Sequence, residues 1–476
     1  MRRRSKFIFI LFIILHIAGF LTSIRAIMDV RTSQGAIAWT ISLNTFPSIS
    51  LPAYWILGNS KFSGYVTARR TEVVEAKPIM RQLLDDFIKY GLKEGENTPR
   101  ALLIQRLAKM PFTKGNTAKL LIDGEDTFDA IFKGIESAKK YVLVQYYILR
   151  DDELGIKLQD ALIEKAKEGV ICLVIYDEVG SRFSKNYRRA FEDAGIRIHA
   201  FNTRQGKGNR FQINFRNHRK IVVADGEVAY VGGLNVGNEY LGLDPGMSPW
   251  RDTHVEIRGP VVQAVQLSFA EDWYWASKEA MPELNWSPKQ VPGGTVTALS
   301  LPSGPADEFE TASLFFLDMI NAAKKRFWLA SPYFVPDEQI VSALQNAALK
   351  GVDVRVIIPK NPDNILVGLS AYSYLPELEK AGVKVYKYNK GFMHQKVILV
   401  DDETSAVGTA NFDNRSFRLN FEITMIMYDR DFAKKTEKML LDDLSRCTQV
   451  SATEYTQANF LFRLAVNVSR LMAPVQ

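Results

Sequence analysis

Two histidines and two lysines recur in the same arrangement in two distant parts of the chain. Each copy reads His-x-Lys, four residues, Asp, six residues and then Gly-[Gly/Thr]-x-Asn. The first copy contains His218, Lys220, Asp225 and Asn235, and the second contains His394, Lys396, Asp401 and Asn411. Every pair of counterparts is 176 positions apart, and only five histidines are present in the chain. A structural accident therefore does not explain both copies.

These residue types suit chemistry at a phosphate. A neutral imidazole can attack phosphorus, and a charged one can donate a proton. An ammonium group stabilises phosphoryl oxygens as their charge builds up. The amides of Asn235 and Asn411 follow glycines in a sharp turn and are expected to bind the same oxygens. Two such half-sites facing each other would surround one phosphate.

The motif aspartates need a separate interpretation. Residues i and i+2 of a strand point to the same face, so each lysine should emerge beside its histidine. Asp225 and Asp401 complete the motif and are counted with the catalytic set. Their odd offset from histidine, however, puts them on the other face of the strand. A structural salt bridge or a turn is the expected role there.

Two further acids are candidates for orienting the histidines. Asp252 and Glu422 lie at roughly matching positions in the strands that follow the two motifs. A carboxylate behind an imidazole fixes its tautomer and stabilises its charged form. The alternative for both residues is an exposed acid at the end of a strand.

The elements that position these residues are also repeated. Each copy predicts a helix end, a buried strand, a helix with a glycine cap, a β-branched strand and a third strand. The corresponding segments are 134–148 with 322–335, 158–169 with 340–351, 170–176 with 352–358, and 195–201 with 382–388. This order is typical of an α/β layer sandwich, and the long period indicates two duplicated domains. The division falls near residues 288–302, which are rich in proline and glycine.

Length and composition restrict the remaining possibilities. With 476 residues, two domains and additional segments are expected. Two cysteines, Cys172 and Cys447, provide neither a disulfide framework nor a thiolate metal site. The net charge of +7 suits an acidic membrane, a phosphate-bearing substrate or nucleic acid, without choosing among them.

The N-terminal region is directed to a membrane. Residues 7–24 are uncharged and mostly apolar, and a second uncharged stretch covers about 35–58. Each is long enough to cross a bilayer, although Pro47 and Pro52 make a kinked or re-entrant hairpin an alternative for the second. A cleaved signal peptide is the less favoured alternative for the first. Basic residues flank the pair, which predicts that both ends are cytoplasmic.

The predicted organisation has four parts. Residues 1–60 hold the two transmembrane segments and 61–110 form a linker or amphipathic region; the two domains occupy 111–290 and 291–476. Arg69, Arg70 and a possible helix at 76–92 would lie on the membrane, or simply form a linker. A basic segment before the first motif would attract anionic headgroups through Arg204, Lys207 and Arg210, or is a solvated loop.

The chain resembles the phospholipase D superfamily and, within it, the bacterial cardiolipin synthases. The double motif carries the resemblance to the superfamily, and flanking segments narrow it to the synthases. Those segments are the two N-terminal stretches, 145–148, 176–181, 216–220, 250–254, 331–336, 411–416, 419–422 and 463–474. The resemblance covers nearly the whole chain, and no motif position departs from the pattern.

The resemblance implies two α/β/α sandwich domains related by pseudo-two-fold symmetry. It also implies reversible phosphatidyl transfer between two phosphatidylglycerol molecules, giving cardiolipin and glycerol through a phosphatidyl-histidine. His218 is favoured as the nucleophile and His394 as the acid/base. No metal and no cofactor are expected, because lysines and asparagines replace the cation. The partners would be phosphatidylglycerol and the membrane, with no nucleic acid, and the location a bacterial inner membrane with cytoplasmic catalytic domains.

Three other readings share parts of this evidence. A phospholipase D-type hydrolase or a transferase to another alcohol would use the same site. A nuclease of the superfamily is disfavoured by the membrane segments and by the lack of an aromatic and basic groove signature. A non-catalytic membrane scaffold is disfavoured because both copies keep histidine, lysine and asparagine.

Overall fold

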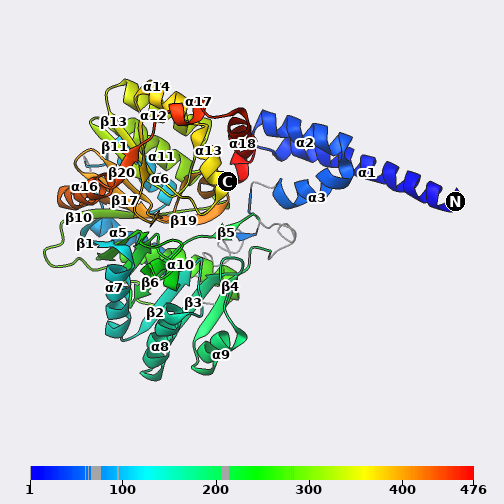
Figure 1. The fold of residues 1–476 in the computed structure, drawn as a ribbon. Coiled ribbons are helices and arrows are strands. Elements are labelled where there is room, and N and C mark those ends of the chain that lie inside the picture. The colour runs from blue at the N-terminus through cyan, green and yellow to red at the C-terminus, as the bar shows by residue number, and fades with distance from the viewer. Residues whose placement is uncertain are drawn as a thin grey trace. The chain divides into compact units, whose positions relative to one another are not determined.

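The computed structural model describes residues 2–58, 61–62, 64–65, 77–93, 96–204, 214–279, 281 and 284–476. The chain divides into two compact units, one formed by residues 1–67 with 202–215 and the other by 68–201 with 216–476. Figure 1 shows the course of the chain within each unit. Arg69, Arg70, Lys207 and Arg210, which the sequence suggested as membrane or headgroup contacts, lie outside the described residues.

The described part of the first unit contains the helices α1 (Arg2–Asp29), α2 (Ser33–Thr45) and α3 (Pro47–Leu57). Among the described residues, one helical stretch, Lys6–Asp29, is long and apolar enough to cross a membrane. The second uncharged stretch forms two shorter helices, separated at Phe46, because Pro47 begins a new helix there. The kinked alternative therefore describes this stretch better than one continuous span. Ala26, Leu43 and Tyr54 join the three helices in a small buried cluster.

The second unit is built on one continuous sheet. In the described part of the chain its order is β4-β3-β2-β6-β7-β9-β1, followed by β10-β19-β17-β16-β11-β13-β14-β20. The strands of the first run are β1 (Thr113–Ile122), β2 (Tyr141–Tyr146), β3 (Ile171–Asp177), β4 (Arg197–Phe201), β6 (Ile221–Ala224), β7 (Val228–Gly232) and β9 (Thr253–Arg258). Those of the second are β10 (Val296–Ser303), β11 (Arg326–Ala330), β13 (Asp353–Pro359), β14 (Lys384–Tyr388), β16 (Val397–Val400), β17 (Thr404–Gly408), β19 (Asn420–Tyr428) and β20 (Cys447–Gln449). Apart from β20, the second run repeats the first in reverse, and the runs meet where β1 pairs with β10.

The helices of the two runs also correspond. Helices α8 (Glu153–Lys167) and α12 (Glu338–Leu349) begin at the N-caps Asp152 and Asp337. Glycines with positive φ, Gly169 at 88° and Gly351 at 90°, follow their ends. The sequence predicted both helices and both glycines, and the mixed α/β fold is confirmed.

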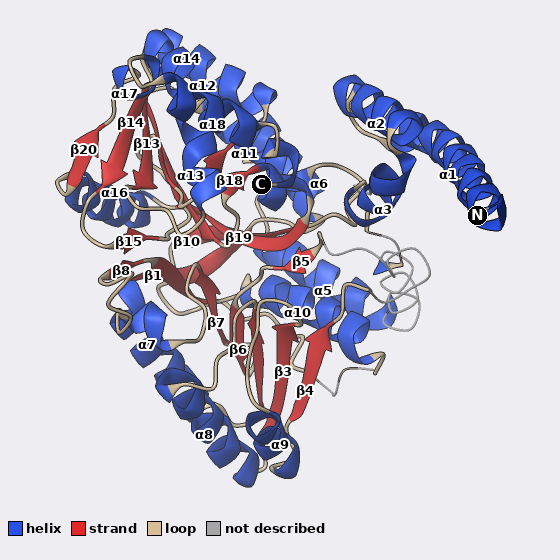
Figure 2. Ribbon diagram, turned by 45° about the vertical axis from the view of Figure 1, so that its right-hand side comes forward, coloured by secondary structure: helices blue, strands red, loops and turns tan. Residues whose placement is uncertain are grey.

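Helices pack on the sheet of each half and bury two apolar cores (Figure 2). The helices not yet named are α5 (Lys77–Tyr90), α6 (Pro99–Ala108), α7 (Asp123–Ser137), α9 (Lys185–Asp193), α10 (Val262–Ser277), α11 (Thr311–Ala322), α13 (Ile365–Tyr372), α14 (Leu375–Ala381), α15 (Asn414–Arg418), α16 (Arg430–Leu444), α17 (Thr453–Thr456) and α18 (Phe460–Arg470). Helix α5 forms where the sequence indicated one, and its Leu83 and Phe87 are buried in a core of this unit. Those two side chains therefore pack on protein.

Candidate active site

The backbone holds each motif histidine against a strand from the other half of the second unit. The short strand β5 (Arg216–Asn217) pairs with the start of β19, and the amide of His218 donates to the carbonyl of Phe421 at 2.9 Å. In the same way β15 (Phe392–Met393) pairs with β8 (Trp250–Arg251), and the amide of His394 donates to the carbonyl of Arg251 at 2.8 Å. Each histidine is thereby bonded to the residue just before an acid of the other half, Glu422 for His218 and Asp252 for His394.

The side chains of the two histidines also contact the other half of this unit. Nδ1 of His218 lies 2.9 Å from Oε2 of Glu422, and Nδ1 of His394 lies 2.8 Å from Oδ2 of Asp252. Both carboxylates are fully buried and both imidazoles nearly so. Since Nδ1 is bonded to a carboxylate, Nε2 is the ring nitrogen left for chemistry in each case. The structure brings together all four residues that the sequence singled out for this role, and it pairs each acid with the histidine of the other half.

Burial keeps both histidines neutral. It lowers the pKa of His218 to about 4, against the opposing charge of Glu422, and it lowers the pKa of His394 to about 4 with help from the charge of Lys396. Burial works to raise the pKa of both acids as well. At Asp252 the charges of His394 and Lys396 outweigh the effect of burial, so the pKa of this carboxylate lies below its usual range. At Glu422 the charges of His218 and Lys220 outweigh burial in the same way and lower its pKa. The resting pairs at neutral pH are thus imidazole with carboxylate.

The two lysines stand differently toward their histidines. Nζ of Lys220 donates to the carbonyl oxygen of His218 at 2.7 Å and lies 5.3 Å from the ring centre of Tyr147. Nζ of Lys396 likewise donates to the carbonyl oxygen of His394, at 2.5 Å, and in addition lies 2.9 Å from Nε2 and 3.0 Å from Nδ1 of the His394 ring. Burial lowers the pKa of both lysines, that of Lys396 to about 8. A bound anion would favour the charged form of Lys396 and raise this pKa.

The motif aspartates are at hairpin turns. Asp225 and Asp401 have positive φ values of 55° and 52°, a conformation that aspartate tolerates better than most residues. The carboxylate of Asp225 accepts from the amides of residues 139–141 at 2.7 to 2.9 Å, and that of Asp401 accepts from those of 324–326 at 2.7 to 3.1 Å. Each aspartate thus ties its hairpin to the start of the neighbouring strand, β2 or β11. This geometry fits the turn role and does not support counting either aspartate among the reacting groups.

The two motif asparagines have different surroundings. Oδ1 of Asn235 accepts from the amide of Ile148 at 3.0 Å, and its Nδ2 donates to the hydroxyl of Tyr240 at 2.9 Å. Oδ1 of Asn411 is buried and has no hydrogen-bond partner among the described residues. The amide of Asn411 is therefore the less committed of the two toward a bound phosphate.

Several residues that the sequence argument did not single out complete the site. Glu422 also accepts from the hydroxyls of Thr409 and Ser416 at 2.6 and 2.9 Å and from the amide of Asn420 at 3.1 Å. At the place of Thr409 the first half has Gly233, where a Cβ would lie 2.0 Å from Oδ1 of Asp252. In the sequence, the only sign of this difference in the surroundings of the two acids was that the first motif copy has Gly-Gly where the second has Gly-Thr.

Two buried acids on helices support the histidine strands. Asp272 on α10 accepts from Gln145, Asn217 and Arg219 at 2.6 to 2.9 Å. Asp443 on α16 accepts from Arg251 at 2.7 and 2.8 Å and from Gln395 at 2.7 Å. These bonds fix the residues next to His218, His394 and Asp252. The sequence carried no signal for them, because each acid lies beside a second acid in its helix, Glu271 or Asp442, and the sequence does not show which of the two faces the site.

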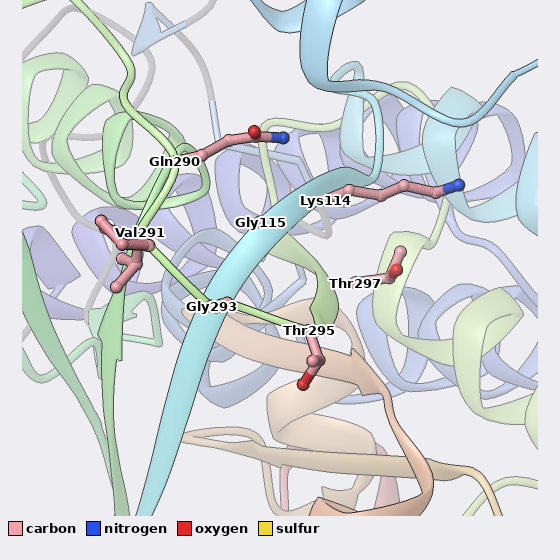
Figure 3. Close-up of a pocket in the computed structure, with 9 residues that line it drawn as sticks. Lys114, Gly115, Gln290, Val291, Gly293, Thr295 and Thr297 are labelled. Atoms are coloured by element: carbon pink, nitrogen blue, oxygen red, sulfur yellow. The ribbon is translucent and has the colours of Figure 1, made fainter.

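A pocket of about 610 Å³ lies elsewhere in this unit (Figure 3). It is formed by the start of β1 and the loop before β10, and no motif residue lines it. Its one charged lining residue, Lys114, pairs with Glu96 at 2.6 Å. The pocket therefore does not gather groups for catalysis, and the paired histidines remain the candidate site.

Comparisons with known proteins show the family to which the chain belongs. The family model described as "Cardiolipin synthase, PLD-like domain" matches residues 131–273 and 316–444, which include both motif copies. "Cardiolipin synthase A" of Pseudomonas putida (strain GB-1) is 47% identical over 466 residues, covering 97% of this chain and 97% of that protein. "Cardiolipin synthase A" of Pseudomonas fluorescens (strain Pf-5) is 45% identical over 468 residues, with the same coverage of both.

A solved structure shows the same fold. The phosphatidylserine synthase of Haemophilus influenzae Rd KW20 matches with a TM-score of 0.60 at 15% identity, covering 80% of this chain and 100% of that one. At this identity the likeness concerns the fold alone. The sequence and family matches go further and confirm the resemblance inferred from the motifs: this chain belongs to the cardiolipin synthase family with phospholipase D-like domains.

Proposed function

We propose that this protein is a cardiolipin synthase, a phosphatidyltransferase that joins two phosphatidylglycerol molecules into cardiolipin and releases glycerol. Family membership supports the enzyme class. The single observation that carries the proposal is the pair of exchanged contacts, His218 with Glu422 and His394 with Asp252. They leave two neutral Nε2 atoms, each with an ammonium group nearby, in a composite site suited to a phosphodiester.

The first half of the reaction forms a covalent intermediate. Nε2 of His218 attacks the phosphorus of one phosphatidylglycerol, so that a P–N bond forms and the P–O bond to glycerol breaks. His394 gives its proton to the departing glycerol oxygen. The negative charge of the bound phosphate raises the low pKa of His394, which allows that proton to be present. Lys220, Lys396, Asn235 and Asn411 hold the phosphoryl oxygens; Asn235 reaches them by giving up its bond to Tyr240.

The second half reverses these steps with a new acceptor. Nε2 of His394 takes the proton from a hydroxyl of the second phosphatidylglycerol, whose oxygen then attacks phosphorus. The P–N bond breaks and cardiolipin leaves. Since every bond change is repeated in the opposite sense, the transfer is reversible. Glu422 and Asp252 orient the two rings through Nδ1 and stabilise each imidazolium while it is charged.

The architecture proposed with this mechanism follows the reversed strand order. Two α/β/α domains, residues 111–290 and 291–476, would be related by a pseudo-two-fold axis that passes between the half-sites. Residues 61–110 would lead from the membrane to the first domain. Residues 7–24 and about 35–58 would hold the protein in a bacterial inner membrane, with the catalytic domains on the cytoplasmic side. Helix α1 supports the first of these membrane segments.

One assay tests the proposal directly. Purified full-length protein is mixed with phosphatidylglycerol in vesicles, without nucleotide, and the products are separated. We expect cardiolipin and glycerol in equal amounts. Phosphatidic acid alone would show that water is the acceptor and that the enzyme is a hydrolase. Turnover that survives both His218→Ala and His394→Ala would place the chemistry elsewhere.

A further inference from the structure

Helices α13 and α18 pack together and leave a shared apolar face uncovered. The hydroxyl of Ser469 donates to the carbonyl of Leu366 at 3.0 Å, and the rings of Tyr372 and Phe462 meet edge to face at 5.3 Å. Figure 1 and Figure 2 show the two helices side by side. The α13/α18 face consists of the exposed residues Ile365, Leu366, Phe460, Leu461, Leu464, Val468, Leu471 and Met472.

The exposed residues of α18 do not lie on its packing side. Val466 and Ser469 are buried against the protein. Leu461, Leu464, Val468 and Leu471 recur every three or four residues on another side, and Leu461 and Leu471 are 74% and 77% exposed. Ile365, at the start of α13, extends the face at 75% exposure and also lines an apolar cavity of about 350 Å³. A contiguous apolar face of this kind marks an interaction surface.

Charge and composition indicate what covers the face. Residues 455–476 contain two arginines, Arg463 and Arg470, and no acid. Both arginines are exposed at the edge between the packed and the apolar sides of α18, where Arg470 also lies over the ring of Tyr374 at 5.0 Å and 4.0 Å from Glu377. Apolar side chains on one side with arginines at the edge are typical of helices that lie in the interface of an anionic bilayer. Hot spots of protein interfaces, by contrast, are enriched in tryptophan, tyrosine and arginine and poor in leucine and valine, whereas the apolar part of this face consists mainly of leucine and valine.

The same segment is bonded to the His218 half-site. Gln476, just after α18, accepts from the hydroxyl of Ser370 at 2.7 Å through its side chain and from the amide of Arg415 at 2.7 Å through its carbonyl. Ser416, which follows Arg415 in the chain, donates from its hydroxyl to the carboxylate of Glu422. A surface on α13 and α18 is therefore fixed with respect to the carboxylate behind His218.

We propose that the α13/α18 face docks the catalytic unit on an anionic lipid leaflet, with its aliphatic side chains inserted among the acyl chains and Arg463 and Arg470 at the headgroups. The proposal rests on the proposed function, because a lipid substrate makes a bilayer the surface at which this unit works. Docking would present the composite site to headgroups within the leaflet.

A label on the face tests docking without relying on activity. Leu464→Cys is introduced in a Cys447→Ser background, where the remaining Cys172 is buried and burial raises its thiol pKa to about 12. The full chain, carrying a polarity-sensitive fluorophore, is reconstituted in vesicles of phosphatidylglycerol and phosphatidylcholine. Leu349→Cys is the matched control, because Leu349 is 73% exposed but lies away from the α13/α18 face. Leu349 precedes strand β13, and α13 follows the other end of that strand.

We expect lipid-attached quenchers to quench the label at position 464 and not the one at 349. Equal quenching by aqueous iodide at both positions would overturn the proposal. A label at 464 that both quenchers fail to reach would also overturn it, in favour of a protein such as a second copy. Because quenching requires no turnover, docking and the proposed reaction can fail separately.

A variant that introduces two negative charges on the face tests what docking does for catalysis. Leu461→Glu with Leu464→Glu should lower turnover of vesicle phosphatidylglycerol about tenfold or more, because two carboxylates would enter an anionic interface. Turnover of dispersed short-chain phosphatidylglycerol should stay within about twofold, which shows that the variant is folded. Leu349→Glu with Leu441→Glu, both exposed elsewhere, is the control and should leave both rates unchanged. Equal loss on both substrates would contradict a docking role.

Discussion

The half-site of His218 and the half-site of His394 share one motif, but the carboxylates behind the two rings are held differently. Glu422 accepts from three side chains besides His218, namely Thr409, Ser416 and Asn420. Asp252 accepts from the amide of Thr253 at 2.8 Å and from the indole of Trp250 at 3.3 Å, in addition to His394. A carboxylate that already has several donors is a weaker proton sink.

The lysines extend the difference. Each lysine donates to the carbonyl oxygen of its own histidine, but Lys396 also contacts Nε2 of His394, whereas Lys220 lies over the ring face of Tyr147. The duplicated motif thus fixes which groups are present, and the residues around it differentiate them. This asymmetry suits two roles, a nucleophile at His218 and a proton carrier beside an ammonium at His394.

Removing either histidine should have the largest effect. We expect His218→Ala and His394→Ala each to lower turnover about 10⁴-fold, because nucleophilic and acid/base catalysis contribute on that order. The variants should differ in a single-turnover experiment with labelled phosphatidylglycerol. His394→Ala should accumulate labelled protein and His218→Ala should not, when denatured protein is collected at neutral pH. Label on His218→Ala alone would invert the assigned roles.

Removing an ammonium group should cost less. Lys396→Met and Lys220→Met are each expected to lower kcat about 10²- to 10³-fold, the usual effect of losing one donor to a developing oxyanion. Thermal unfolding of each variant shows whether the site is still folded. Lys289→Met, a change at a lysine outside the site, serves as the control. A loss under tenfold for either lysine would remove it from the phosphate-binding set.

The third test places alanine at Gly233 and at Thr409, the matching positions at which the two halves differ. Gly233→Ala should lower turnover about 10²-fold, because its Cβ would stand 2.0 Å from Oδ1 of Asp252 and would displace that carboxylate. Thr409→Ala removes one of several donors to Glu422, so we expect a loss under tenfold and about 1 kcal/mol of stability. Steady-state kinetics with calorimetry measure both. Equal losses would show that the two carboxylates are held alike.

The sequence predicted the fold and the residues of the site better than it predicted their pairing. Strand periodicity and the repeat were enough for the α/β halves, and the same-face rule placed each lysine beside its histidine. Neither rule states which acid meets which histidine, since that depends on the pairing of β5 with β19 and of β8 with β15 across the halves. The contribution of Asp272 and Asp443 could not be predicted for a similar reason: an acid on a helix gives no sign of which groups of other elements it faces.

The smallest effect, and the sharpest test of the lysine difference, is the pH dependence of kcat/KM. The neutral form of His218, the nucleophile, should be lost as the pH falls through about 4, and the charge of Lys396 should be lost as the pH rises through about 8. We therefore expect a plateau between these values, with about a tenfold fall per pH unit beyond each. Residual activity of Lys396→Met should lack the limb near pH 8. A limb that persists in this variant and disappears in Lys220→Met would assign the titration to Lys220, and the contact between Lys396 and His394 would then not be what sets the half-sites apart.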